Sequence, residues 1–168
     1  MKGVKFRGWA PDLGEWVYGA YYEHCNCAAC FSEDDKPEYY EAKIVFETLM
    51  DWGLPYRTMV ADVTRESVGR CAGQLPNGKE IYEGDIVQRK DIAIDAGIVR
   101  LGDYLDKDCS RRFGFYIDWL AGNSIEQDLV CWLEDVRIIG NTFESPELIE
   151  KIYKGDRAWQ NKEIRRTP

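Results

Sequence analysis

Hydrophobic and polar positions alternate along much of the chain, with the two-residue period that is typical of β-strands with one buried face. The alternation is clearest over 4–9 and 15–22, on either side of the turn sequence Pro11-Asp12-Leu13-Gly14. Two alternating runs joined by turn residues predict a β-hairpin. A third strand is predicted over 56–63. The amino-terminal part of the chain is therefore expected to begin as a sheet.

Short apolar runs separated by tight turns fill the second half of the chain. The dipeptide Asn77-Gly78 is the strongest turn signal, because both residues accept positive φ angles. Glu83-Gly84-Asp85 marks a second bend. Closely spaced short strands are typical of small barrels, and the pattern predicts a small barrel-like module. Its strands are expected at 81–82, 86–87, 97–101, 113–119, 129–133 and 136–140.

Two segments have helical spacing instead. In Glu38–Trp52 the apolar residues recur at helical intervals and Gly53 supplies a stop, although the β-branched and aromatic content also permits a strand. Ser145–Gly155 has a serine N-cap, a proline at the first helical position and a closing glycine, which predict a short carboxy-terminal helix. Between these segments, Thr64 is expected to cap a turn over 64–69 through its hydroxyl.

Together these elements predict a mainly β protein with minor α content. A hairpin-plus-helix region over 1–63 is expected to pack on the same core as a β-barrel module over 64–157, with a polar tail at 158–168. A chain of 168 residues is long enough to bury one sizeable core. Aromatic residues make up 13% of the chain, which is enough to leave interface anchors beyond those that fill a core.

The chain is acidic, with a formal net charge of −8. Nucleic-acid binding depends on positive charge that displaces counterions from phosphates, so this balance disfavours it. The basic clusters in the sequence are Arg111-Arg112 and 162–166. The amino terminus lacks the apolar segment of a secretory signal, and no apolar run approaches the roughly 18 residues of a membrane span. We therefore expect a soluble cytoplasmic protein, in which the cysteines are reduced thiols.

Three stretches of the sequence form a recognisable set of motifs. They are Lys5-Phe6-Arg7-Gly8 with Gly14–Gly19, then Glu66–Gly69 through Asn77–Val87, and finally Ile138–Asn141 with Glu144–Leu148. In this order, and spread over nearly the whole chain, they resemble the YopX-like family of phage and prophage proteins. The resemblance implies a small pseudo-barrel fold, loosely similar to OB and SH3 barrels, and a homo-oligomeric assembly in the cytoplasm of the bacterial host. It implies no catalytic residues, because none is established for the family.

The sequence departs from the family pattern at Arg70-Cys71 and in the cysteine-rich stretch from His24 to Cys30. Within that stretch, Cys27 and Cys30 have the spacing of half a zinc knuckle, and His24 or Cys25 could complete a tetrahedral structural site. A second ligand pair would have to come from the same loop or from Cys71. The alternative is a loop of reduced thiols, so zinc is a candidate cofactor only.

The sequence offers little catalytic machinery. His24 is the only histidine, so any Ser–His or Cys–His pair would have to use it. No glycine-rich phosphate loop is present. Glu41-Ala42-Lys43 resembles the acidic-x-Lys element of some nucleases, but that element normally lies on a strand and Glu41 falls in a predicted helix. Carboxylates that could hold Mg²⁺ are Glu33, Asp34, Asp35, Asp103, Asp106 and Asp108, although solvated acidic loops are the commoner explanation.

A candidate surface for nucleic acid or for a protein partner lies on the strand predicted at 113–119. Phe113, Phe115 and Trp119 follow Arg111 and Arg112, which combines stacking side chains with cations as in single-strand binders. A small barrel needs the same aromatic residues to fill its core, and this second interpretation is favoured.

The sequence as a whole favours a non-enzymatic phage accessory protein. It would act by self-association or by binding a host or phage protein, with Trp9, Trp16 or Trp159 as interface aromatics. An OB-like binder of single-stranded nucleic acid through 111–119 is the alternative. Mg²⁺-dependent cleavage of phosphodiesters, using Asp34, Asp35 and Glu41, is the most remote of the three.

Overall fold

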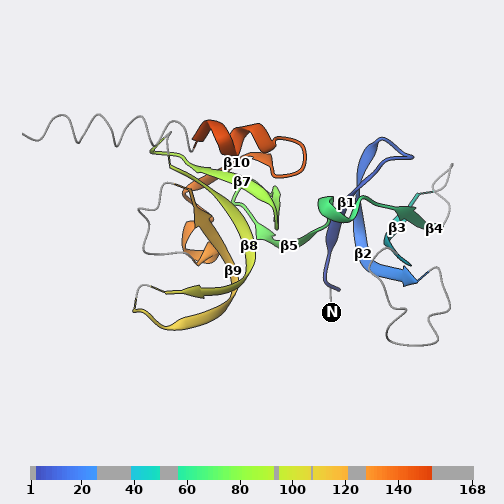
Figure 1. Cartoon of the computed structure of the whole chain (residues 1–168), viewed down its shortest axis with the longest axis horizontal. Helices are drawn as coiled ribbons and strands as arrows, with labels where there is room; N and C mark the ends of the chain where they lie inside the picture. Colours follow the sequence, from blue (N-terminus) through green and yellow to red (C-terminus); the bar gives the residue numbers. More distant parts are fainter. Residues whose placement is uncertain are drawn as a thin grey trace, which may run out of the picture. The chain divides into compact units, whose positions relative to one another are not determined.

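The computed structural model describes residues 3–25, 39–49, 57–92, 95–106, 108–120 and 128–152. The chain divides into two compact units, residues 1–71 and 72–168 (Figure 1). Each unit contains antiparallel strands and its own cluster of buried apolar side chains. The mainly β fold predicted from the alternating pattern is therefore confirmed.

The first unit is built on a sheet with the strand order β4-β3-β2-β1. These strands are β1 (Phe6–Ala10), β2 (Glu15–Cys25), β3 (Tyr40–Thr48) and β4 (Arg57–Asp62). The first residues of β5 (Gly69–Gln74) pair with β1 on its other side. The predicted β1–β2 hairpin is confirmed: Trp9 lies opposite Trp16, and Gly14 takes a φ angle of 67° in the connecting turn.

The helix predicted over Glu38–Trp52 is wrong, because Tyr40–Thr48 is strand β3. Ala42 and Ile44 are buried, whereas Glu41 in front of them is exposed and Lys43 between them is partly exposed. Burial therefore alternates with a period of two. The strand pairs with β2 on one side and β4 on the other. A spacing of four residues, such as Ala42 to Phe46, fits a helix and a strand equally well. Pairing on both sides, which suits the β-branched Ile44, decides the outcome.

The core of the first unit lies on one face of this sheet. Its buried side chains are Ala10, Val17, Ala42, Ile44, Ala61 and Val63, with Phe6, Tyr21, Phe46 and Val68 packed against them. Gly8 lies directly below this cluster: a Cβ atom at Gly8 would stand 2.9 Å from Cβ of Val63. The close approach of β1 to Val63 therefore requires a glycine.

The turn that follows β4 contains the short 3₁₀ helix η4 (Arg65–Ser67). The expected hydroxyl cap from Thr64 is wrong, because the Thr64 side chain makes no capping hydrogen bond. Ser67 fulfils a related role instead. Its buried Oγ accepts a hydrogen bond from the Trp9 backbone N–H at 2.8 Å and donates to the Thr64 carbonyl at 2.6 Å.

The second unit contains a four-stranded antiparallel sheet with the order β10-β7-β8-β9, while β6 pairs with β5. The strands are β6 (Glu80–Tyr82), β7 (Asp85–Arg89), β8 (Ala96–Leu105), β9 (Arg111–Trp119) and β10 (Val136–Asn141). The Asn77-Gly78 turn is confirmed: Gly78 has a φ angle of 82°, and Asn77 Oδ1 accepts a hydrogen bond from the Lys79 N–H. The described strands form open sheets, so the predicted pseudo-barrel is not a closed barrel.

Residues 129–133 are not a strand, as the sequence suggested, but contain the 3₁₀ helix η5 (Leu129–Trp132). The Asp128 side chain accepts a hydrogen bond from the Val130 N–H, which favours a helical turn at this point. The predicted carboxy-terminal helix is confirmed, and it is described from residue 146 to residue 152. Leu148 of this helix packs so closely on Gly140 of β10 that a Cβ there would lie 2.9 Å from Leu148 Cδ1.

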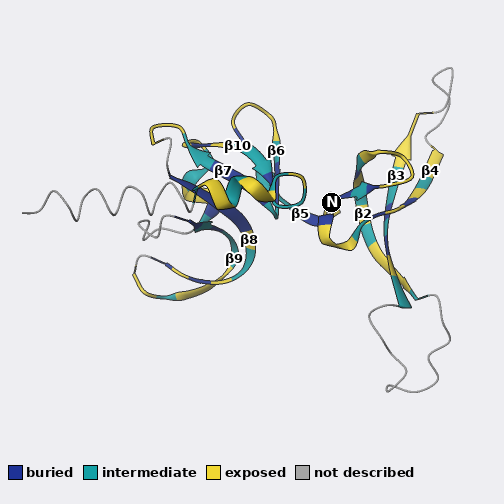
Figure 2. Cartoon of the chain, turned by 45° about the horizontal axis from the view of Figure 1, so that its top comes forward, coloured by how far each residue is buried: buried dark blue, intermediate teal, exposed yellow. Residues whose placement is uncertain are grey.

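The core of the second unit is formed by side chains from the four-stranded sheet, from the β5–β6 segment and from η5. It contains Leu75, Ile81, Val87, Val99, Ile117, Trp119, Leu129 and Val136, all less than 9% exposed. Trp132 of η5 meets Trp119 edge to face, with ring centroids 5.1 Å apart. Figure 2 shows the inner parts of β7 and β8 as buried, while the far end of the β8–β9 hairpin is exposed. No helix in the described parts of the chain is long and apolar enough to cross a membrane.

Candidate functional site

The candidate surface predicted at 111–119 lies on β9, an outer strand of the sheet in the second unit. β9 pairs with β8 along its whole length, from Arg111 opposite Leu105 to Trp119 opposite Gly97. Successive side chains of a strand point to opposite faces of the sheet. Phe113 therefore shares a face with Arg111, Phe115 and Trp119, whereas Arg112 lies on the other face.

The Phe113 face runs directly into the core of the second unit. Ile117 is 0% exposed, Trp119 is 6% exposed, and Phe115 packs against the same cluster. Trp119 is therefore a core residue and takes no part in the predicted surface. A tryptophan two residues from a buried isoleucine shares its face, and this placement follows from the period of the strand.

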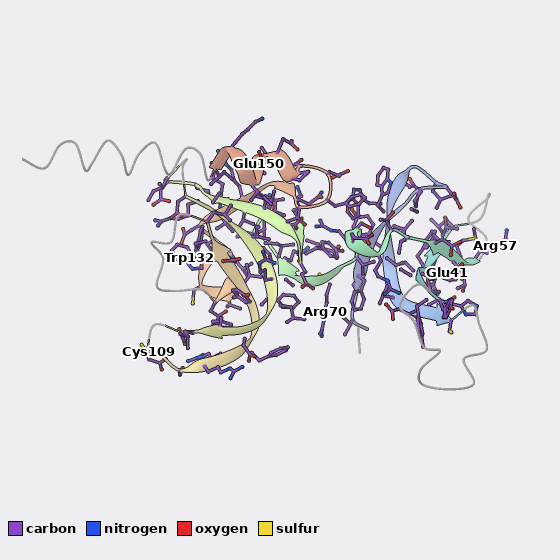
Figure 3. The ribbon with its side chains drawn as sticks, viewed as in Figure 1. Glu41, Arg57, Arg70, Cys109, Trp132 and Glu150 are labelled. Carbon is purple, nitrogen blue, oxygen red and sulfur yellow. The ribbon has the colours of Figure 1, made fainter. Side chains whose placement is uncertain are left out.

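Phe113 lies at the end of this face that is far from Trp119, beyond the buried cluster. Its side chain is 73% exposed, and Leu105 on β8 is 60% exposed on the same face. Figure 3 shows Cys109 at the turn that closes this hairpin, where the residue takes a φ angle of 62°. The sequence reasoning missed Leu105. The alternation of Leu101, Asp103 and Leu105 along β8 was the signal that could have placed it beside Phe113.

The arginines of the hairpin are all engaged by aspartates of the same hairpin. Arg111 contacts Asp103 at 2.7 Å, Arg112 contacts Asp106 at 2.7 Å, and Arg100 contacts Asp118 at 2.8 Å. The hydrogen bond to Asp103 raises the pKa of Arg111, so its guanidinium stays charged. Since each guanidinium already has a carboxylate, the cations that the sequence offered for phosphate contacts are largely neutralised.

The opposite face of the hairpin carries a polar cluster around Tyr104. The Tyr104 ring stacks on Tyr116 with centroids 5.5 Å apart, and its hydroxyl donates to Asp128 Oδ2 at 3.0 Å. Burial, and then the hydrogen bond to Asp128, raise the pKa of Tyr104, so its phenol remains a donor at neutral pH. Asp128 also forms a β-bridge with Tyr116. Among the described residues, the outer edge of β9 over 111–115 has no strand beside it.

The candidate zinc ligands fall only partly within the described residues. His24 and Cys25 end β2, opposite Glu41 and Tyr40 of β3, while Cys27 and Cys30 lie outside the described residues. As neighbours on a strand, His24 and Cys25 point to opposite faces, so one zinc ion would be bound by only one of them. In the ranges that the structure describes, no group of three or more His, Cys, Asp or Glu side chains could hold a metal ion. A zinc site built from this loop stays a prediction.

Glu41 lies on a strand and not on a helix, which removes the objection to its nuclease-like spacing. However, Lys43 contacts Glu41 at 2.8 Å and also forms an ion pair with Asp62 of β4. Figure 3 places Glu41 and Arg57 in this same part of the first unit. Asp34 and Asp35 lie outside the described residues, as does Glu33. Asp103 and Asp106 are engaged by arginines, and Asp108 accepts hydrogen bonds from Ser110.

The tryptophans proposed as interface anchors are partly buried where they are described. Trp9 and Trp16 meet edge to face at 5.9 Å, and the Arg7 guanidinium lies over the Trp16 ring at 5.0 Å. Trp159 and the basic stretch 162–166 lie outside the described residues. Among the described residues, Phe113 is the most exposed aromatic side chain.

The described residues form an antiparallel β protein of two units. In the second unit, Phe113 and Leu105 are exposed apolar side chains at the end of the β8–β9 hairpin, whose strand β9 lies at the edge of the sheet. A family model described as YopX protein matches residues 5–150. This match covers most of the chain, and the protein belongs to the YopX family. The resemblance carried by the sequence motifs is thereby confirmed. A search of the curated proteins found no match.

Proposed function

We propose that the protein is a non-enzymatic accessory protein of a phage or prophage, and that it acts in the bacterial cytoplasm by self-association. The contact is made by the outer edge of β9 and the end of the β8–β9 hairpin. The observation that carries this proposal is Phe113, a large aromatic that is 73% exposed on an outer strand. An exposed, apolar outer strand is a template for pairing with another chain.

Local charge supports a second copy of the chain as the partner. Two chains of net charge −8 repel each other through most of their surfaces. The segment from β8 to β9 carries four acidic and four basic residues, so it is neutral within this acidic protein. Its arginines and aspartates form ion pairs with each other. The hairpin is therefore a place where two copies can meet without strong repulsion.

A two-fold antiparallel pair of β9 strands centred on Phe113 satisfies these constraints. In this register Phe113 faces its own copy, and Arg111 faces Phe115 across the pair, so no like charges lie opposite each other. The pair uses only residues 111–115, and thereby avoids the part of β9 that Asp128 covers. Strand addition of this kind supplies backbone hydrogen bonds, while Phe113 and Leu105 supply apolar contact.

The test is a native mass spectrum of the wild-type protein and of Phe113→Ser. We expect an oligomer for the wild type and a shift towards monomer for the variant. Val60→Ser is the matched control, because Val60 is a 52% exposed apolar residue on the outer strand β4. A monomeric wild type at micromolar concentration would refute self-association. An oligomer that survives Phe113→Ser but not Val60→Ser would refute the assignment to β9.

Binding of single-stranded nucleic acid is the alternative, supported by the exposed Phe113 next to Arg111 and Arg112. Exposed aromatic rings stack on bases, and each such contact is worth about 1–3 kcal/mol. The ion pairs of both arginines and the burial of Trp119 weigh against it. An electrophoretic shift with single-stranded DNA at low salt tests it. No shift under these conditions excludes this alternative.

A further inference from the structure

A cavity of about 270 Å³ opens on the surface of the second unit. It lies between the turn that joins β5 to β6 and the strand β10. Its walls are formed by Leu75, Pro76, Asn77, Lys79, Lys90, Val136, Arg137 and Ile138. All eight residues belong to one compact unit, so the cavity is formed within it.

Among the described residues, the walls contain three cations and no carboxylate. The Lys90 ammonium donates to the Glu134 backbone carbonyl, and the Arg137 guanidinium donates to Gln88 Oε1 at 2.6 and 3.1 Å. Neither of these acceptors carries a charge. Lys79 is an exposed residue on the turn, and it forms no ion pair with any residue that the structure describes. In a protein with a net charge of −8, three cations that have no carboxylate partner in the described part of the chain give the cavity a local positive potential.

The floor of the cavity is apolar and well ordered by packing. Leu75 is 6% exposed and Val136 is 1% exposed, and both belong to the core of the second unit. Ile138 packs against the same core. The accessible apolar part of the wall is formed by the exposed Pro76 and the partly buried Ile138, which lie over the buried Leu75 and Val136. A ligand that fits here combines negative charge with a small apolar body.

Backbone hydrogen bonds hold the two lysines in place. The Leu75 N–H donates to the Lys79 carbonyl at 2.8 Å, which closes the turn that carries Lys79. The Gln74 side chain adds a hydrogen bond to the Gly78 carbonyl at 2.7 Å. Lys90 follows β7, and its N–H donates to the Asp135 carbonyl at 2.8 Å. Both lysines therefore project from fixed backbone positions.

We infer that this cavity is a binding site for a phosphate monoester with a small apolar group. A phosphate monoester carries a charge of about −1.5 to −2 at neutral pH, which matches two ammonium groups. The volume is slightly below the roughly 300 Å³ at which ordinary ligand pockets begin, so the apolar group is small. Lys79 and Lys90 bind the phosphate, and the apolar group packs on Pro76 and Ile138, the less buried apolar residues of the wall.

Arg137 has a different role from the two lysines. It lies between Val136 and Ile138 on β10, so its side chain leaves the strand on the face opposite to theirs. There it donates hydrogen bonds to Gln88, its pairing partner on β7. Arg137 therefore adds positive potential to the cavity wall, while contact with the ligand falls to the lysines.

Phenyl phosphate is the probe for this site, measured by isothermal titration calorimetry on the full-length chain. We expect saturable binding that weakens as salt is raised, because the attraction is largely electrostatic. Lys79→Met and Lys90→Met each remove a charge-assisted contact and should weaken binding about tenfold or more. Lys151→Gln is the matched control, because Lys151 is an exposed lysine on the helix at 146–152, outside the cavity walls. Its affinity should equal that of the wild type.

Three results would overturn the inference. The first is no heat of binding at millimolar phenyl phosphate, and the second is equal weakening by the control and the two cavity variants. The third is equal affinity for benzyl alcohol or benzoate, which would show that no phosphate is recognised. Phe113→Ser should bind phenyl phosphate normally, so this site and the proposed self-association can fail independently.

Discussion

At the edge of β1, the Ser67 hydroxyl accepts a backbone hydrogen bond that a neighbouring strand would otherwise accept. The Trp9 N–H points away from β2 towards the turn that follows β4, where Ser67 Oγ accepts it at 2.8 Å. The Trp9 carbonyl in turn accepts a hydrogen bond from the Thr64 N–H at 2.9 Å. Ser67 is only 5% exposed, so water has little access to these groups. The side chain thus continues the pairing that β5 begins at Phe6 and Arg7.

We expect Ser67→Ala to lower the free energy of unfolding of the first unit by about 1–3 kcal/mol, because a buried N–H is left without an acceptor. Urea denaturation of wild type and variant measures this loss. Thr64→Ala is the matched control and should change stability by less than about 0.5 kcal/mol, since the Thr64 hydroxyl forms no cap. Equal losses in the two variants would contradict the role given to Ser67.

At the scale of elements, the sequence predicted strands well where turn chemistry bounded them. Asn77-Gly78 and the proline-glycine turn before β2 placed the starts of the strands that follow them, β6 and β2, within one residue, whereas β5 in front of Asn77 was not predicted. β3 was missed because Ala42, Phe46 and Leu49 also repeat at helical intervals, and only pairing with β2 and β4 decides between the two. η5 was missed because its apolar run looks like a strand, although Asp128 in front of it is a helix-start signal.

The β8–β9 hairpin carries a ladder of diagonal ion pairs, but its members differ in burial. Arg111 and Asp103 are both exposed, whereas the side chain of Asp106, the ion-pair partner of Arg112, is only 7% exposed. Exposed ion pairs contribute roughly 0–1 kcal/mol, because water screens them. A buried carboxylate that loses its cation costs considerably more.

We therefore expect Arg112→Ala to destabilise the protein by about 1 kcal/mol or more, and Arg111→Ala to change its stability by less than about 0.5 kcal/mol. Chemical denaturation at neutral pH provides both values. Raising the salt concentration should change the stability of the wild type only slightly. If Arg111→Ala proved the more costly replacement, burial would not be what separates the two pairs.

At the scale of the whole molecule, the candidate sites show what sequence reading can and cannot find. Arg111 and Arg112 were found because they are adjacent, yet the structure engages both with aspartates. Lys79, Lys90 and Arg137 were not found, because they are far apart in the sequence. Only the pairing of β7 with β10, and the turn before β6, bring them to one cavity. Adjacent charge is visible in a sequence, whereas the partners that neutralise it are not.

The two buried clusters predict that the two units respond separately to core mutations. Ile44 belongs to the first cluster and Ile117 to the second, and both are 0% exposed. Replacing either by alanine should cost about 2–5 kcal/mol. Hydrogen exchange followed by mass spectrometry should show faster exchange in β2–β4 for Ile44→Ala, and in β7–β9 for Ile117→Ala. Faster exchange in both regions for each variant would show one cooperative structure.

The edge-to-face tryptophan pairs have a spectroscopic consequence. Trp9 and Trp16 lie in the first unit, and Trp119 and Trp132 in the second, with ring centroids 5.9 and 5.1 Å apart. Indole rings held this closely at a fixed angle couple their electronic transitions, which produces a paired positive and negative band in circular dichroism. Each unit therefore contains its own optical reporter. Trp16→Phe should remove the paired band of the first unit, and Trp132→Phe that of the second. The unfolding of each unit can then be followed separately, without any added label.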